Sequence, residues 1–111
     1  MKQIENLYRL GALTQIVLDV QLARLTEAAA AREVSLAHLA SLAQVTQAVG
    51  LSEMAQAQVQ LTYDRWAEAR RAEVNLVLAR QTAEWMQARA DASLAFGRRD
   101  VLRRLAEKPQ R

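Results

Sequence analysis

Residues that could carry out chemistry are few in this sequence and lie far apart along it. His38 is the single histidine and there is no cysteine, so the chain lacks the residues of a usual zinc site. Most acidic residues stand one helical turn from an arginine, as Glu5 does from Arg9 and Asp100 from Arg104, which is the spacing of ordinary ion pairs on a helix surface. The glycines form no phosphate-binding loop. We therefore expect no catalytic, metal or cofactor site and no enzymatic activity.

The largest local excess of charge lies near the C-terminus. Residues 98–111 carry six Lys or Arg side chains against two acidic ones, whereas residues 1–50 carry four of each. Such a segment could bind an acidic protein, an anionic membrane surface or nucleic acid. The charge is confined to one end, which argues against nucleic acid, and the narrow apolar face without tryptophan argues against a membrane. We predict that a protein partner binds Arg98, Arg99, Arg103 and Arg104. The alternative is a solvated helix end whose cations are favoured by the helix dipole.

Two long helices must position these residues. A composition dominated by Ala, Leu, Glu, Gln and Arg is typical of long helices and coiled coils. Gly50 suits the left-handed position after a helix end, and Ser52 suits the N-cap of the next helix. We predict an all-α, long antiparallel two-helix coiled-coil hairpin as a single domain over residues 1–111. Its parts are a first arm over about 2–49, a turn at about 50–52, a second arm over about 53–106 and a short tail at 107–111. Because no apolar stretch approaches the ~20 residues of a membrane-spanning helix, we expect a cytoplasmic protein.

Heptad spacing predicts the seam, which is the contact between the two arms. In the first arm the predicted seam residues are Leu18, Leu22, Leu25, Ala29, Arg32, Leu36, Leu39 and Ala43. In the second arm they are Val59, Tyr63, Trp66, Val74, Leu78, Gln81, Trp85, Ala88, Ala92 and Ala95. Folding the chain about Gly50 places Leu36 opposite Trp66 and Arg32 opposite Arg70. The two arginines would then form a polar layer that fixes the register, or would reach along the seam to solvent.

A second set of apolar residues lies off this predicted seam. It comprises Leu10, Leu13, Val17 and Val20 in the first arm and Leu76, Leu94, Val101 and Leu105 in the second. Two helices alone rarely hide so wide an apolar stripe. We predict either a homodimer, in a four-helix arrangement formed through Leu10, Leu13, Val17 and Val20, or a groove for a dedicated partner.

In overall form the chain resembles the small coiled-coil proteins of type III export systems, the FliJ/YscO group of flagellar and injectisome proteins. The resemblance lies in a small, cysteine-free hairpin rich in Ala, Gln and Arg. It lies also in the pattern from Trp85 through Ala88, Ala92 and Ala95 to Gly97-Arg98-Arg99-Asp100-Val101-Leu102.

This resemblance implies a hairpin at the export apparatus that acts like the central stalk of a rotary ATPase. It would insert into a hexameric export ATPase, contact the export gate and escort chaperones. By position, the arginines at 98, 99, 103 and 104 would contact the ATPase. The alternative is a self-associating structural or adaptor module without a role in export.

Overall fold

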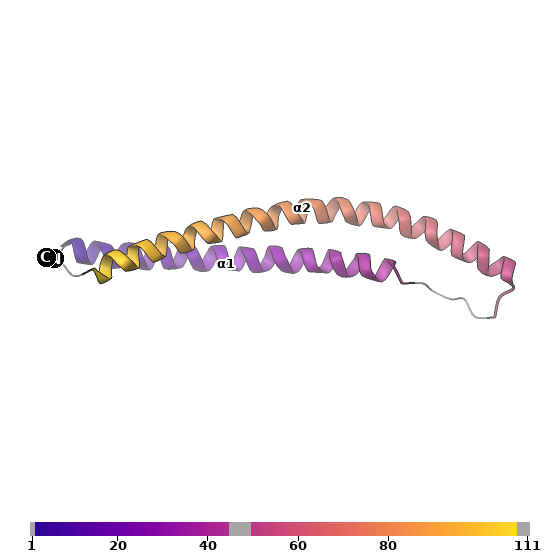
Figure 1. Cartoon of the computed structure of the whole chain (residues 1–111), viewed down its shortest axis with the longest axis horizontal. Helices are drawn as coiled ribbons and strands as arrows, with labels where there is room; N and C mark the ends of the chain where they lie inside the picture. The colour runs from indigo at the N-terminus through magenta and orange to yellow at the C-terminus, as the bar shows by residue number, and fades with distance from the viewer. Residues whose placement is uncertain (1, 45–49, 109–111) are drawn as a thin grey trace. The chain divides into compact units, whose positions relative to one another are not determined.

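The protein consists of two helices joined as a hairpin in the computed structural model, which describes residues 2–44 and 50–108 (Figure 1). Helix α1 spans Lys2–Leu42 and helix α2 spans Glu53–Glu107. The described residues contain no strand. The predicted all-α, two-helix hairpin is therefore confirmed.

Helix α1 ends earlier than the sequence predicts. The N–H of Ala43 donates to the carbonyls of Leu39 and Ala40 at 3.2 Å each, which is the shared bonding of a tightened last helical turn. Ala43 and Gln44 are no longer helical, so the predicted continuation of the first arm to residue 49 is wrong at these two positions. Its remaining part, residues 45–49, lies outside the described residues.

The start of α2 follows the predicted signals. The backbone N–H of Ala55 donates to Ser52 Oγ at 3.3 Å, so Ser52 caps the helix and satisfies one of its unpaired N–H groups. Gly50 has φ of 90°, a left-handed conformation that glycine adopts without the steric cost of a Cβ atom. Because α1 ends at Leu42, Gly50 is not the position after a helix end that the sequence predicts.

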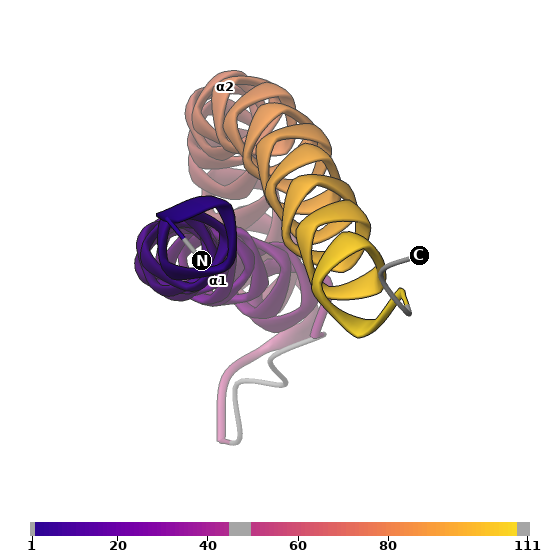
Figure 2. The same cartoon turned by 90° about the vertical axis from the view of Figure 1, so that its left-hand side faces the viewer.

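The chain divides into two compact units, and each contains a piece of both helices. Unit 1 comprises Met1–Ala30 and Ala83–Arg111, and unit 2 comprises Ala31–Thr82. Within unit 1, Figure 2 shows the first turns of α1 (indigo) and the last turns of α2 (yellow) at the same end of the molecule.

Both helices bury a stripe with heptad spacing. On α1 the buried and half-buried residues are Leu7, Gly11, Thr14, Gln15, Leu18, Gln21, Leu25, Ala28, Ala29, Arg32, Ser35, Leu36, Leu39 and Leu42. On α2 they are Ala55, Gln60, Tyr63, Ala67, Val74, Leu78, Gln81, Thr82, Trp85, Ala88, Asp91, Ala92, Ala95, Arg99, Asp100 and Leu102. The predicted second-arm stripe from residue 74 to residue 95 is confirmed. Much of this seam is small or polar, which the apolar pattern alone does not indicate.

The register between the helices differs from the predicted one. In unit 2, Arg32 Nε donates to Thr82 Oγ1 at 3.1 Å, and Ser35 Oγ donates to Gln81 Oε1. Arg32 therefore lies beside a residue about twelve positions further along α2 than Arg70, and the predicted Arg32–Arg70 layer is wrong. The physical reason is the connection: ten residues separate Leu42 from Glu53, whereas a tight turn at Gly50 would need α1 to continue to residue 49.

Trp66 is the clearest consequence of this shift. It is 56% exposed, and the neighbouring Ala67 occupies the buried position at 3% exposure. With Arg32 beside Thr82, α1 has already ended at Leu42 before it could cover Trp66. The predictions that Trp66 and Val59 are seam residues are wrong, as are those for Leu22 and Ala43, which are also exposed.

Candidate protein-binding surface

The four residues predicted for self-association lie together on α1 in unit 1. Leu10, Leu13, Val17 and Val20 are 46–59% exposed, so each keeps about half of its surface in water. Leu18, between them in sequence, is buried against α2 at 4% exposure. The four residues, named here the outer α1 face, are therefore an apolar surface that α2 leaves open.

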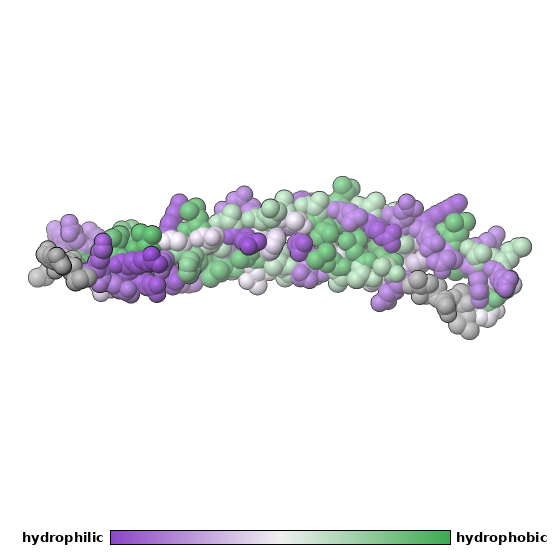
Figure 3. All heavy atoms as spheres, viewed as in Figure 1, coloured by the Kyte–Doolittle hydropathy of each residue, from purple (hydrophilic) through white to green (hydrophobic). Residues whose placement is uncertain are grey.

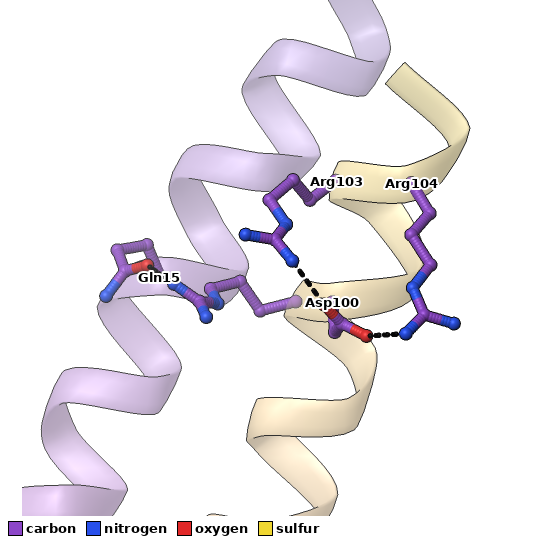
Figure 4. A network of polar contacts seen from close by, with 5 residues as sticks. Gln15, Asp100, Arg103 and Arg104 are labelled. Atoms are coloured by element: carbon purple, nitrogen blue, oxygen red, sulfur yellow. Dashed lines mark hydrogen bonds and ion pairs between the residues drawn. The ribbon is translucent and has the colours of Figure 1, made fainter. Parts of the chain in front are cut away.

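The predicted arginine site does not form one cluster. Arg103 Nη2 and Arg104 Nη2 lie 2.9 and 3.1 Å from the two carboxylate oxygens of Asp100, one turn earlier on α2. Figure 4 shows the two arginines converging on this carboxylate, with Gln15 of α1 nearby. Two of the four predicted cations are therefore already paired within α2.

Arg99 belongs to the seam rather than to the surface. Its Nη1 donates to Gln15 Oε1 at 3.2 Å, and its guanidinium carbon lies 5.2 Å from the centre of the Phe96 ring. A partner could use Arg99 only by displacing these contacts. Arg98, in contrast, is exposed, and no ion pair or hydrogen bond reaches it within the described part of the chain.

Arg98 also borders a groove whose full set of lining residues we did not predict from the sequence. A groove of about 990 Å³ lies between α1 and α2 in unit 1, and we name it the arginine-edged groove. Its apolar lining is Leu10, Leu94, Val101 and Leu102. Its small lining residues are Thr14, Ala90, Ser93 and Gly97, and Arg98 is its one charged residue. The signal in the sequence is the set of small residues next to Leu94 and Val101 on one face of α2.

Unit 2 has two smaller hollows beside its seam. One, of about 600 Å³, is lined by α2 alone and includes Tyr63 and Trp66, whose ring centres are 5.8 Å apart. The other, of about 300 Å³, lies where Leu42 and Gln44 meet α2 near Arg71. On the face drawn in Figure 3, apolar residues (green) lie at the surface among polar ones (purple). Exposed apolar surface is thus present in both units.

Residues for other kinds of chemistry are not brought together. His38 is exposed, and no group of three His, Cys, Asp or Glu residues within 2–44 and 50–108 could hold a metal ion. Neither helix, over its described length, contains a segment apolar and long enough to cross a membrane. No protein-family model, curated protein or solved structure matches the chain.

Proposed function

We propose that this chain is a non-enzymatic protein-interaction module, a helical hairpin whose exposed apolar side chains pack against other polypeptide chains. The observation that carries the proposal is the distribution of residue types. The seam contains small and polar residues such as Ser35 and Ala95, while most large apolar side chains lie outside it. Burial of apolar surface is the dominant favourable contribution to protein association, so this distribution favours a partner.

The first half of α1 shows the imbalance most clearly. Eight large apolar side chains between residues 4 and 22 are 39–67% exposed, although α2 covers one side of the helix. A helix that is apolar on all sides is normally surrounded by protein or lipid. Since no membrane-spanning segment is found in the described helices, a surrounding of protein is the better explanation.

A second copy of the chain is the simplest partner for the outer α1 face. Full burial of one large apolar side chain corresponds to roughly 60–120 Å² at about 25 cal/mol per Å². The four half-exposed side chains of the outer α1 face would therefore contribute on the order of 200 Å² per copy, and the four other exposed apolar side chains between residues 4 and 22 would contribute a similar area where the partner wraps around α1. A standard interface buries about 800 Å² per partner, and about 65% of a homodimer interface is non-polar. The outer α1 face thus supplies part of such an interface, and neighbouring exposed residues of α1 would have to supply the rest.

Photo-crosslinking in the native cell tests the proposal. A photoreactive amino acid in place of Leu13 should give a defined protein adduct, whereas the same group in place of Ala79, an exposed residue of unit 2, should not. An adduct of twice the chain mass indicates self-association, and any other defined adduct indicates a different partner. Equal, diffuse labelling from both positions would contradict an interaction surface on α1.

The resemblance to type III export proteins gives the proposal its most specific form, in which the partner is a hexameric export ATPase. Co-sedimentation of the purified chain with the export ATPase of the same cell tests it. Wild type should co-sediment, and a variant with Arg98, Arg99, Arg103 and Arg104 changed to glutamine should not. If neither binds, the export role is withdrawn and the self-associating or adaptor module remains.

A further inference from the structure

The arginine-edged groove combines the two properties of a site for an amphipathic helix. Its positions on α2 at 90, 94, 97 and 101 advance by four, three and four residues, so they follow one face of the helix over about 17 Å. A partner helix that enters a groove presents apolar residues with the same spacing over a similar length. The groove thus has the length and the direction that such a helix needs.

Small side chains make close approach of a third helix possible. The distance between packed helices depends on the side chains at the contact and falls toward 8 Å where they are small. Gly97 and Ala90 lie one above the other on this face, and a Cβ atom added at Gly97 would meet nothing within 4 Å. Space therefore remains above Gly97 for an apolar side chain of the partner.

The charge at the edge of the groove indicates which kind of helix would bind there. Arg98 is exposed at the edge of the groove, while Arg103 and Arg104 are paired with Asp100 and Arg99 is bound to Gln15. The guanidinium of Arg98 is thus available for a carboxylate, with which it can form two parallel hydrogen bonds. An acidic residue beside the apolar stripe of the partner would meet this requirement.

The groove of a second copy is a poor partner for this groove. In a two-fold symmetric contact the same patch faces itself, so Arg98 of each copy and the basic excess of residues 98–111 would meet like charges. Like charges across an interface suppress association. Leu10 belongs both to the outer α1 face and to the groove lining, whereas Leu13, Val17 and Val20 do not line the groove. Self-association through these three residues is therefore compatible with an open groove.

We propose that the arginine-edged groove binds an acidic amphipathic helix of another protein, whose apolar residues contact Leu94 and Val101 and whose carboxylate pairs with Arg98. The inference rests on the proposed function as an interaction module and names the chemistry of one partner.

Fluorescence anisotropy with two synthetic helical peptides tests this inference. Each has about 18 residues, with leucines spaced as i, i+4, i+7; one carries glutamates beside the leucine stripe and the other carries lysines at the same positions. The glutamate peptide should bind the full chain at least about tenfold more tightly than the lysine peptide. Arg98→Glu should reverse the preference, while Arg65→Glu, the same charge change at an exposed site of unit 2, should leave it unchanged.

A groove-filling variant separates binding from folding. Gly97→Leu should abolish binding of the glutamate peptide without lowering the thermal midpoint, and Gly11→Ala, also in an open helical position, should retain it. Equal binding of both peptides, or unchanged binding by Arg98→Glu, would overturn the inference. If the peptides fail to bind while a photoreactive group at residue 13 still gives a defined adduct, the groove does not bind an acidic helix. The proposed function as an interaction module is then still supported.

Discussion

Arg32 of α1 donates a hydrogen bond from Nε to Oγ1 of Thr82 on α2, 3.1 Å away. One turn later on α1, the buried Ser35 repeats the arrangement with Gln81. Polar pairs inside a helix–helix contact specify register, because any sliding leaves their hydrogen-bonding groups unpaired. In unit 2 these two polar contacts therefore help to fix the alignment of the helices, together with buried apolar residues such as Leu42 and Val74.

Ser35→Ala should lower the free energy of unfolding by about 1–3 kcal/mol, because Gln81 Oε1 then loses its donor in a partly buried site. Ser35→Ala combined with Gln81→Leu should recover most of this loss, since both partners are then apolar. Urea unfolding at constant protein concentration measures both variants. Thr62→Ala is the matched control, because its hydroxyl bonds the Gln58 carbonyl on an exposed surface. An equal cost for the Thr62 and Ser35 variants would show that the buried contact does not hold the register.

Trp66→Ala should cost about 1–3 kcal/mol of stability, less than the roughly 3–5 kcal/mol of a fully buried tryptophan, because more than half of the side chain already lies in water. Val74→Ala, which truncates a buried seam residue, should cost a similar amount, about 1–3 kcal/mol, although it removes far fewer atoms. Thermal unfolding followed by circular dichroism compares the two variants. A loss of roughly 3–5 kcal/mol for Trp66→Ala would restore the register in which that tryptophan faces Leu36.

Gly11→Ala and Gly97→Ala should each stabilise the protein by roughly 0.5–1 kcal/mol, because both positions are helical and the added methyl group meets nothing within 4 Å. Gly50→Ala should act in the opposite direction, since φ of 90° is strained for alanine. Differential scanning calorimetry of the three variants shows whether each substitution raises or lowers the stability. A stabilising Gly50→Ala would contradict the left-handed conformation in the connection.

Asp100→Asn should cost about 1 kcal/mol, because the arginines that it pairs are 58% and 76% exposed and solvent screens their charges, while the Asp100 side chain itself is only 18% exposed. The same change should strengthen binding of the glutamate peptide to the arginine-edged groove, most at low ionic strength, since it removes a negative charge from this end of α2 and leaves Arg103 and Arg104 without their ion pairs. Glu73→Gln, which breaks the Arg70 ion pair in unit 2, is the control and should not affect binding. Titrations at low and physiological salt separate the two variants.

Local signals predicted the helices and the start of α2, because those features depend on few neighbouring residues. Ser52 supplies an oxygen to a nearby N–H group, and Gly50 tolerates positive φ whatever the tertiary structure. The end of α1 has no such signal: neither glycine nor proline occurs between Leu42 and Gly50. The β-branched residues Val45 and Thr46 lower helix propensity only slightly. The register between the helices depends on where α1 ends. Because no residue type marks that end, the heptad pattern alone could not predict the register.

The candidate site was predictable in part for the same reason. Exposure of Leu10 and Leu13 follows from an apolar stripe wider than one partner helix can cover. The different contacts of the four arginines do not follow from their spacing, because Arg99 hydrogen-bonds Gln15, which is distant in sequence. The heptad pattern predicted Gln81 as a seam residue but missed Ser35, because a search for large apolar residues passes over a buried serine.

A seam in which alanine, serine, glutamine and threonine fill about half of the positions has a consequence for the heat capacity of the protein. Unfolding raises heat capacity in proportion to the apolar area exposed and lowers it with the polar area, ordinarily by a net ~12–15 cal/mol/K per residue. The isolated hairpin buries few large apolar side chains, so its heat-capacity change on unfolding should fall below this range. Its free energy of unfolding should therefore vary only gently with temperature. A partner that covers the outer α1 face or the arginine-edged groove would add the missing apolar area. The free energy of unfolding of the complex would then vary more strongly with temperature than that of the hairpin alone. Calorimetry would detect the partner as a larger heat-capacity change on unfolding.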